Sequence, residues 1–230
     1  PYRRQRQMCI RDRAHPLQFF DSIDSTNIRA KLEAEQGAKS GLLVVSDMQS
    51  AGRGRRGRSW ESPAGTNIYY TLMLKPDFSS DCAPMLTLVM ALAVAKGIRQ
   101  TLRRDSEEAA AKVGIKWPND IVVDGKKVCG ILTEMSMEQG YIQHIVIGVG
   151  INVRKQEFPE EIRDRAAAID EQCGFRISRS QLIADIMEAF EEDYEIFLRT
   201  HDLKGLRASY AELLVNQDRE VCVLDPKGEY

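Results

Sequence analysis

The pattern of hydrophobic and polar positions predicts helices in three long segments of the chain. One follows "DSTN", which offers typical N-cap residues, and stops at Gly37, so a helix is expected to open near Ser25. The run "APMLTLVMALAVAKGIRQTLRR" is apolar nearly all round, which predicts a buried helix. Its strongly apolar part, residues 85–95, falls well short of the roughly 20 residues of a membrane span. "RSQLIADIMEAFEEDYEIFLR" is amphipathic and predicts a long helix, with a shorter one near residues 206–214.

Short apolar runs bounded by turn residues predict the strands. "GLLVVSD" and "TNIYYTLMLK" each have the composition of a buried strand. Between residues 114 and 153, "GIKWPNDIVVDGKKVCGILTEM" and "YIQHIVIGVGINV" predict three or four strands joined by hairpin turns, of which Asp124-Gly125 is the clearest. Because these strands are consecutive and helices bracket them, the order favours an α+β fold around a mixed or antiparallel central sheet flanked by helices. A doubly wound fold is disfavoured.

The two ends of the chain differ from the segment between them. Residues 1–18 show no apolar periodicity and no signal-peptide core, so we expect a leader that is not native or is disordered, with the main domain at residues 19–214. Residues 215–230 include "REVCVLDPKGEY", in which apolar residues alternate before a Pro-Lys-Gly turn. This pattern predicts the start of a truncated C-terminal β module.

Composition limits the class of protein and its compartment. The chain of 230 residues carries 32 Lys and Arg against 34 Asp and Glu, a formal net charge of -2, which disfavours general nucleic-acid binding. Its five cysteines are scattered without a CxxC pair, and none of its three histidines has ligand spacing. We therefore expect a reduced, cytoplasmic protein without a structural zinc ion and without a membrane span.

Residues 50–60, "SAGRGRRGRSW", concentrate four arginines in a chain that is not basic overall. The segment satisfies the GxGxxG dinucleotide pattern, but no helix is predicted after Gly57, so a pyrophosphate would find no helix N-terminus there. An RNA contact would require further basic or aromatic elements, and a solvated surface loop would not require interleaved glycines. The guanidinium groups of arginine and accessible backbone N–H groups can together donate hydrogen bonds to a phosphate or a carboxylate. We interpret the segment as an anion-binding loop.

Three further motifs place polar groups at the ends of predicted elements. In "KWPNDIVVDGKKVCGILTE", Lys116 precedes a turn with Asn119 and Asp120, and Lys127 and Glu134 flank the strand around Gly130. An ordinary turn with a packed tryptophan would have the same "WPND" residues. "DSTN" at 24–27 is either a simple N-cap or a set of neutral hydrogen-bonding groups. "GVGIN" at 148–152 is either a buried strand end or part of a site. The motifs indicate one site only in combination.

In order and spacing, these motifs resemble those of the catalytic domain of biotin protein ligases, which attach biotin to the carrier domains of carboxylases. The matching stretches are "DSTN", "QSAGRGRRGRSW", "GTNIYYTLML", "KWPNDIVVDGKKVCGILTE" and "IGVGINV". The resemblance implies the biotin/lipoate ligase fold, which is like that of class II aminoacyl-tRNA synthetases, followed by the start of a small SH3-like β barrel. It also implies a cytoplasmic enzyme that uses ATP with Mg²⁺, and it leaves open whether the enzyme is a homodimer.

The implied reaction has two steps. Biotin carboxylate attacks the α-phosphate of ATP to give biotinyl-5'-AMP and pyrophosphate, and a lysine of a biotin carboxyl carrier protein then takes the biotinyl group and releases AMP. Bringing two anions together requires positive charge, which also stabilises the leaving group. The ureido ring of biotin requires a few neutral polar groups in an otherwise apolar pocket.

The resemblance assigns roles to individual residues. Lys116 is expected between the biotin carboxylate and the α-phosphate, and Arg55 is expected as the second catalytic residue. The expected biotin site comprises Ser25, Thr26, Asn27, Gln49, Gly52, Arg53, Gly54, Arg55, Lys116 and Gly130. The expected nucleotide site comprises Arg55, Arg56, Arg58, Trp60, Asn119 and Asn152. No metal ligand is named.

Some features depart from parts of the family, and two rival functions remain. Too few residues precede residue 19 for a helix-turn-helix repressor domain, so we expect no specific DNA binding. The region after Asn152 contains no tryptophan, which argues against a tryptophan lid over adenine. One rival is a lipoate or octanoyl ligase, whose acyl tail has no ureido head. The other is an RNA-binding module that uses residues 52–60.

Overall fold

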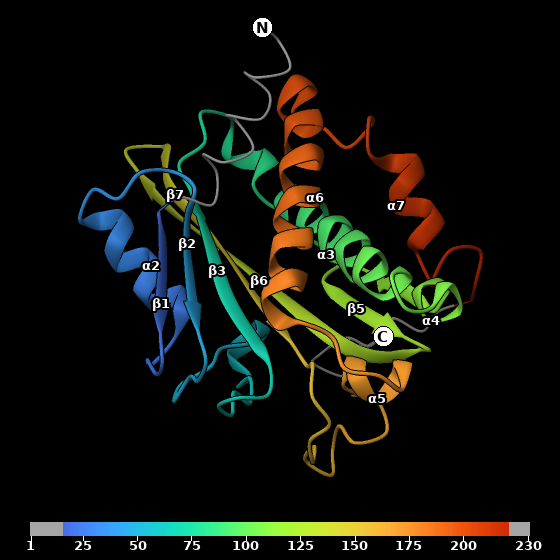
Figure 1. The fold of residues 1–230 in the computed structure, drawn as a ribbon. Coiled ribbons are helices and arrows are strands. Elements are labelled where there is room, and N and C mark those ends of the chain that lie inside the picture. The colour runs from blue at the N-terminus through green and yellow to red at the C-terminus, as the bar shows by residue number, and fades with distance from the viewer. Residues whose placement is uncertain (1–15, 221–230) are drawn as a thin grey trace, which may run out of the picture.

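The computed structural model describes residues 16–220, which form one sheet with helices on both faces (Figure 1). The strands are β1 (Leu17–Phe20), β2 (Leu42–Ser46), β3 (Ile68–Leu74), β4 (Val113–Lys116), β5 (Asp120–Val123), β6 (Lys126–Glu138) and β7 (Tyr141–Ile151). The helices are α2 (Thr26–Glu35), α3 (Met85–Arg103), α4 (Glu107–Ala111), α5 (Ile169–Cys173), α6 (Arg179–Thr200) and α7 (Arg207–Leu213), with short 3₁₀ turns η1 (Arg55–Gly57) and η2 (Ser80–Cys82).

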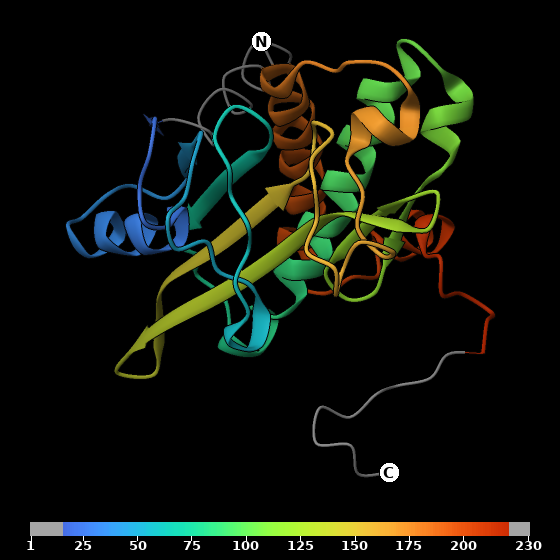
Figure 2. The ribbon, with the colours of Figure 1, turned by 90° about the horizontal axis from the view of Figure 1, so that it is seen from below.

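The sheet has seven strands in the order β1-β2-β3-β7-β6-β5-β4. β1 pairs with β2 in parallel, and all other neighbouring strands are antiparallel. Asp124 and Gly125 have φ angles of 50° and 75°, as a tight hairpin turn between β5 and β6 requires. The long β6–β7 hairpin projects past the neighbouring strands (Figure 2). The predicted α+β class with a mixed sheet is confirmed, and four strands occupy residues 113–151.

Helices cover both faces of the sheet because side chains alternate along each strand. On β3, Met73 belongs to a cluster with residues of α2, whereas Leu72 and Leu74 belong to the larger core with α3 and α6. The predicted buried helix is α3, in which residues 89–95 are all fully buried. The segment Ser80–Arg103 is long and apolar enough to cross a membrane by length and composition, but 61% of its most apolar window is buried. Its apolar surface is thus covered by the packing of the core.

The structure adds elements that the sequence pattern did not predict. β1 begins at Leu17, so the predicted boundary between residues 18 and 19 falls inside a strand, while residues 1–15 lie outside the described part. α4 and α5 have five residues each, which is too few for a helical period to be recognised. The predicted C-terminal β module falls mainly on residues 221–230, which also lie outside the described part.

His144 of β7 is a buried imidazole that should make the stability of the fold dependent on pH. Its side chain is 1% exposed, and neither ring nitrogen has a hydrogen-bond partner among the described residues. Burial lowers the pKa of this imidazole, and nearby Glu35 offsets only part of the effect. The unfolded chain therefore takes up a proton at a higher pH than the folded chain, so the free energy of unfolding should fall as the pH drops below about 6.5.

His144→Gln removes this titration and should make the loss of stability smaller. Urea unfolding of both proteins between about pH 7.5 and about pH 5.5 measures how much free energy of unfolding each one loses. The carboxylates are the same in both proteins, so the difference between the two losses reports on His144. An equal loss of stability in the two proteins would contradict the role of His144.

Candidate functional site

A small pocket, which we call the central pocket, lies on the α2 side of β6 and β7 and has a volume of about 60 Å³. The loop of residues 50–60, the turn between β4 and β5, and the start of α2 meet there. It is lined by Ser25, Thr26, Asn27, Gln49, Arg53, Gly54, Arg55, Trp60, Asn119, Lys127, Gly130, Ile131, Leu132, Gly148, Val149 and Gly150. The fold thus brings together the motifs that are separate in the sequence.

The floor of the central pocket consists of glycines on two adjacent strands. Gly130 of β6 pairs directly with Gly150 of β7. A Cβ atom at Gly150 would lie 2.5 Å from the Trp60 ring, and one at Gly148 would lie 2.0 Å from Asn27 Oδ1. Glycine is therefore required for the indole ring and the Asn27 amide to lie directly on the sheet. The Trp60 Nε1 atom is buried without a hydrogen-bond partner among the described residues.

One end of the central pocket is lined by neutral hydrogen-bonding groups. The backbone N–H and the hydroxyl of Thr26 both donate to Gln49 Oε1, at 2.8 and 3.1 Å. Gln49 Nε2 donates to Ser62 Oγ at 3.0 Å, and Thr71 Oγ1 donates to Asn27 Oδ1 at 2.6 Å. A connected network of this kind restrains the side chains to one arrangement. The network therefore defines the orientations of the polar groups at the neutral end.

The other end of the central pocket is cationic. Arg55 Nη1 donates to Asn119 Oδ1 at 2.7 Å, and Asn119 Nδ2 donates to a backbone carbonyl of β6 at 3.1 Å. These bonds fix the loop of residues 50–60, which we call the arginine loop, to the turn between β4 and β5. Lys127 Nζ lies 2.7 Å from Asp120 Oδ1 and 5.5 Å from the centre of the Trp60 ring. Both cations are thus oriented by a neighbouring oxygen.

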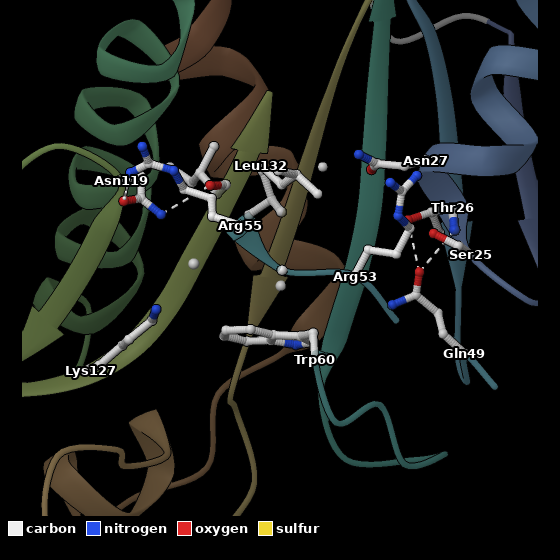
Figure 3. Close-up of a pocket in the computed structure, with 16 residues that line it drawn as sticks. Ser25, Thr26, Asn27, Gln49, Arg53, Arg55, Trp60, Asn119, Lys127 and Leu132 are labelled. Carbon is white, nitrogen blue, oxygen red and sulfur yellow. Dashed lines mark hydrogen bonds between the residues drawn. The ribbon is translucent and has the colours of Figure 1, made fainter. Parts of the chain in front are cut away.

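The two ends of the central pocket lie on opposite sides of Trp60. Figure 3 shows Arg55, Asn119 and Lys127 on one side and Ser25, Thr26, Asn27, Gln49 and Arg53 on the other. The positive charge of Arg53 is paired with the carboxylate of Glu134, so no unpaired charge lies among the neutral groups. The pocket therefore suits an elongated molecule that is neutral and hydrogen-bonding at one end and anionic at the other.

A wide cleft of about 1620 Å³ opens beside the central pocket and shares Trp60 and Lys127 with it. Arg58 and Asn152, which the sequence analysis expected near the nucleotide, line this cleft. Phe158 lines it too, so an aromatic ring follows Asn152 in the structure although the segment has no tryptophan.

Lys116 lies outside the central pocket, although the sequence analysis expected it in the biotin site together with the residues that line this pocket. It ends β4, and β4 is two strands away from β6, about 10 Å at ordinary strand spacing. Its side chain lines the wide cleft instead. The ammonium group of the central pocket belongs to Lys127, because Lys127 lies on β6, which forms part of the floor.

The remaining predicted residues divide into two groups. Those that the structure brings to the central pocket are Ser25, Thr26, Asn27, Gln49, Arg53, Gly54, Arg55, Trp60, Asn119 and Gly130. Gly52 does not line the pocket, and a Cβ atom added to it would be 2.3 Å from the Trp60 carbonyl oxygen. The exposed Arg56 lines neither cavity. Lys127, Gly148 and Gly150 also line the pocket. They belong to motifs that the sequence analysis singled out, but they were not among the residues that it assigned to the site. Gly148 and Gly150 lie two residues apart in a predicted strand, so their positions face the same side of the sheet. This spacing could have identified a glycine-lined face from the sequence.

Gly148→Ala should destabilise the protein by about 1–3 kcal/mol, because the new methyl group overlaps the Asn27 amide in a packed site. Asn27 would also lose its bond from Thr71. Urea unfolding measures the change. Gly54→Ala is the matched control, since its added Cβ meets nothing closer than 3.2 Å. A loss at Gly148 no larger than that at Gly54 would contradict the close packing described.

Sequence comparison relates the chain to known proteins. Residues 19–152 match the biotin/lipoate A/B protein ligase family. The bifunctional ligase/repressor BirA of Bacillus subtilis (strain 168) is 40% identical over 200 residues, which are 85% of this chain and 59% of that protein. The biotin–[acetyl-CoA-carboxylase] ligase of Paracoccus denitrificans is 40% identical over 130 residues, 56% of this chain and 51% of that protein. The chain therefore spans little more than half the length of these relatives.

Solved structures share the fold. The biotin protein ligase of Aquifex aeolicus in complex with biotin and ATP has a TM-score of 0.72 and 28% identity, covering 87% of this chain and 79% of that one. The biotin protein ligase of Leishmania major in complex with biotinyl-5-AMP has a TM-score of 0.70 and 25% identity. The match covers 91% of this chain and 85% of that one. The structural similarity thus extends beyond the segment that matches the family.

Proposed function

We propose, because this chain belongs to the biotin/lipoate A/B protein ligase family, that it activates biotin with ATP and joins it to a lysine of a carrier protein. The observation that carries the proposal is the polarity of the central pocket, with neutral groups at one end and Arg55 and Lys127 at the other. Biotin has the same polarity, since its ureido ring is neutral and its tail ends in a carboxylate. The match supports biotin as the acid that is activated.

The similar proteins support the same chemistry. One relative is named as a ligase for acetyl-CoA carboxylase, and the similar structures contain biotin with ATP, or biotinyl-5-AMP. We extend to this chain biotin and ATP as substrates and a biotin carboxyl carrier protein domain as acceptor. The repressor part of the B. subtilis relative's name is not extended to this chain, and homodimer formation stays a prediction.

The neutral end of the central pocket would hold the ureido ring. The ring offers one carbonyl acceptor and two N–H donors, and the hydroxyl groups of Ser25 and Thr26 and the amide of Gln49 can match both. The glycine floor and Trp60 offer an apolar surface for the tail. This arrangement would bring the biotin carboxylate to Lys127.

The cationic end would serve the first step. One oxygen of the biotin carboxylate forms a bond to the α-phosphorus of ATP, and the bond from that phosphorus to the pyrophosphate oxygen breaks. Lys127 and Arg55 would reduce the repulsion between the two anions and stabilise the charge that grows on the transferring group. Asp120 and Asn119 hold these cations in place, so little reorganisation is needed when the substrates bind.

In the second step the ε-amine of the carrier lysine attacks the acyl carbon of the adenylate. The carbon–oxygen bond to the phosphate breaks, AMP leaves, and the amine loses a proton. Because water would hydrolyse the mixed anhydride, the loop of residues 52–60 would have to exclude water until the carrier arrives. The bond between Arg55 and Asn119 closes this loop against the β4–β5 turn.

The wide cleft would take the nucleotide. Its position beside Lys127 and Trp60 puts it next to the reacting carboxylate, and Arg58 adds a positive charge. Residues 16–220 contain no group of three His, Cys, Asp or Glu side chains placed to hold a metal ion. Magnesium would supply positive charge to the phosphates and would be held mainly by those phosphates and by water. No protein ligand is assigned to it.

The rival acid is lipoate or octanoate, because the family includes lipoate ligases. An acyl tail without a ureido ring would cover the neutral end without forming any hydrogen bond to the remaining donors and acceptors of its hydroxyl and amide groups. The connected network around Thr26 and Gln49 therefore favours biotin.

Transfer to acceptor domains tests the proposal. The protein is incubated with ATP, magnesium and either biotin with a biotin carboxyl carrier domain or lipoate with a lipoyl domain, and the acceptor mass is measured. We expect one biotinyl group on one carrier lysine and no lipoyl transfer. Transfer of lipoate alone would assign the chain to the lipoate branch, and tight RNA binding at physiological salt without any transfer would favour the RNA-binding module.

A further inference from the structure

Glu134 of β6 lies beside the central pocket without lining it. It is on the same face of β6 as Gly130 and Leu132, because side chains on a strand alternate. Its side chain is 19% exposed. None of the steps described above uses this carboxylate, although burying a charge requires compensation by partners.

The Glu134 carboxylate has three partners from two separate elements. Asn27 Nδ2 donates to Oε2 at 2.8 Å, and Lys31 Nζ donates to Oε1 at 2.7 Å. Arg53 Nη2 lies 3.3 Å from Oε1. Burial raises the pKa of Glu134, but the hydrogen bonds from Asn27 and Lys31 outweigh burial and hold it below its ordinary value. A charged carboxylate thus links α2 to the arginine loop.

Arg53 depends on this carboxylate for its position. Its side chain is 44% exposed, and among the described residues Glu134 is the only acidic side chain in contact with it. It points toward Asn27 at the neutral end of the pocket (Figure 3). The loop is therefore fixed on both sides of Trp60, at Arg55 by Asn119 and at Arg53 by Glu134.

The same carboxylate fixes the amide of Asn27. Asn27 Oδ1 accepts from Thr71 Oγ1 and its Nδ2 donates to Glu134, so the two bonds determine which way the amide faces. Removing the charge of Glu134 would release Arg53 and weaken the restraint on Asn27, while Lys127 and Arg55 would keep their own partners.

We propose that Glu134 is a positioning residue that holds Arg53 over the neutral end of the central pocket and thereby sets the affinity for the ureido end of the ligand. This inference rests on the proposed function. It assigns Glu134 to ligand binding and leaves the chemical step to the cationic end.

Two measurements on Glu134→Gln test the inference. In ATP–pyrophosphate exchange, KM for biotin should rise about tenfold while kcat changes less than about twofold, since one charged contact is lost away from the reacting atoms. In the protein without ligands, amide hydrogen exchange of residues 52–60 should become faster. Glu134→Asp, which keeps the charge, should restore part of both properties. Glu33→Gln, which removes a carboxylate of α2 that pairs with Arg29, is the matched control and should change neither.

A double variant separates positioning from a general effect on the fold. If Glu134 acts through Arg53, Glu134→Gln with Arg53→Gln should raise KM no more than Arg53→Gln alone, whereas independent effects would multiply. Multiplied effects, an unchanged KM, or unchanged exchange of residues 52–60 would overturn the inference. If wild type shows no biotin-dependent exchange of pyrophosphate, the proposed function fails, but hydrogen exchange still reports whether Glu134 holds the loop.

Discussion

Lys127→Ala should lower the single-turnover rate of biotinyl-adenylate formation by about a hundredfold or more, which corresponds to roughly 3 kcal/mol of lost transition-state stabilisation. Lys127 lies in the central pocket, it is oriented by Asp120 at 2.7 Å, and it faces the position proposed for the biotin carboxylate. Rapid quenching after mixing the protein with biotin and ATP measures the rate. Urea unfolding of the variant verifies that the fold is retained.

Lys116→Ala is the matched control for this prediction. It makes the same chemical change in the same hairpin region, but Lys116 lines the wide cleft and not the central pocket. The rate should fall less than in Lys127→Ala, by less than about tenfold, because Lys116 lines the cleft proposed for the nucleotide and not the pocket proposed for the reacting carboxylate. A large loss at Lys116 together with a small one at Lys127 would restore the placement expected from the sequence.

Arg55→Gly should leave adenylate formation measurable but should release the adenylate at least about tenfold faster. The substitution removes the 2.7 Å bond to Asn119 that closes the loop, while Lys127 and the neutral end remain. Released adenylate is a reactive acylating agent, so lysines of unrelated proteins should become biotinylated. Incubation with ATP, biotin and serum albumin, followed by a blot for biotin and filter trapping of the adenylate, measures both effects.

Arg56→Gly is the control for the effect of loop composition. Arg56 is exposed, lines neither cavity, and has a φ of 58°, a conformation that glycine adopts without strain. This variant should retain the adenylate as wild type does. If Arg55→Gly makes the adenylate and releases it no faster than wild type, the loop is not a lid.

Much of the fold could be predicted because the elements carry local signals. The apolar run of α3, the Asp124-Gly125 turn and the stop at Gly37 each act within a few residues. The pairing of β3 with β7 and the parallel pairing of β1 with β2 join distant segments, and no local pattern encodes them. The strand order could therefore be established only from the structure.

The places of the two lysines could not be distinguished from the sequence for the same reason. Lys116 and Lys127 both belong to "KWPNDIVVDGKK", and their distance along the chain does not tell which one reaches the pocket. Only the order β7-β6-β5-β4 puts Lys127 on the floor and Lys116 at the edge. The sequence placed Glu134 beside the strand around Gly130 but gave it no role, because its partner Asn27 is 107 residues away. In contrast, "DSTN" and the arginine loop were recognised because each concentrates its polar groups in one stretch.

The central claim is that the central pocket activates biotin as an adenylate. The most direct test is the exchange of labelled pyrophosphate into ATP, in which the wild-type protein is supplied with ATP and magnesium and with biotin, lipoate or no acid. Reversible adenylate formation predicts label in ATP only when biotin is present, with the exchange largely lost in Lys127→Ala and retained in Lys116→Ala. Exchange that does not require biotin, or its absence from a protein shown to be folded, would contradict the claim.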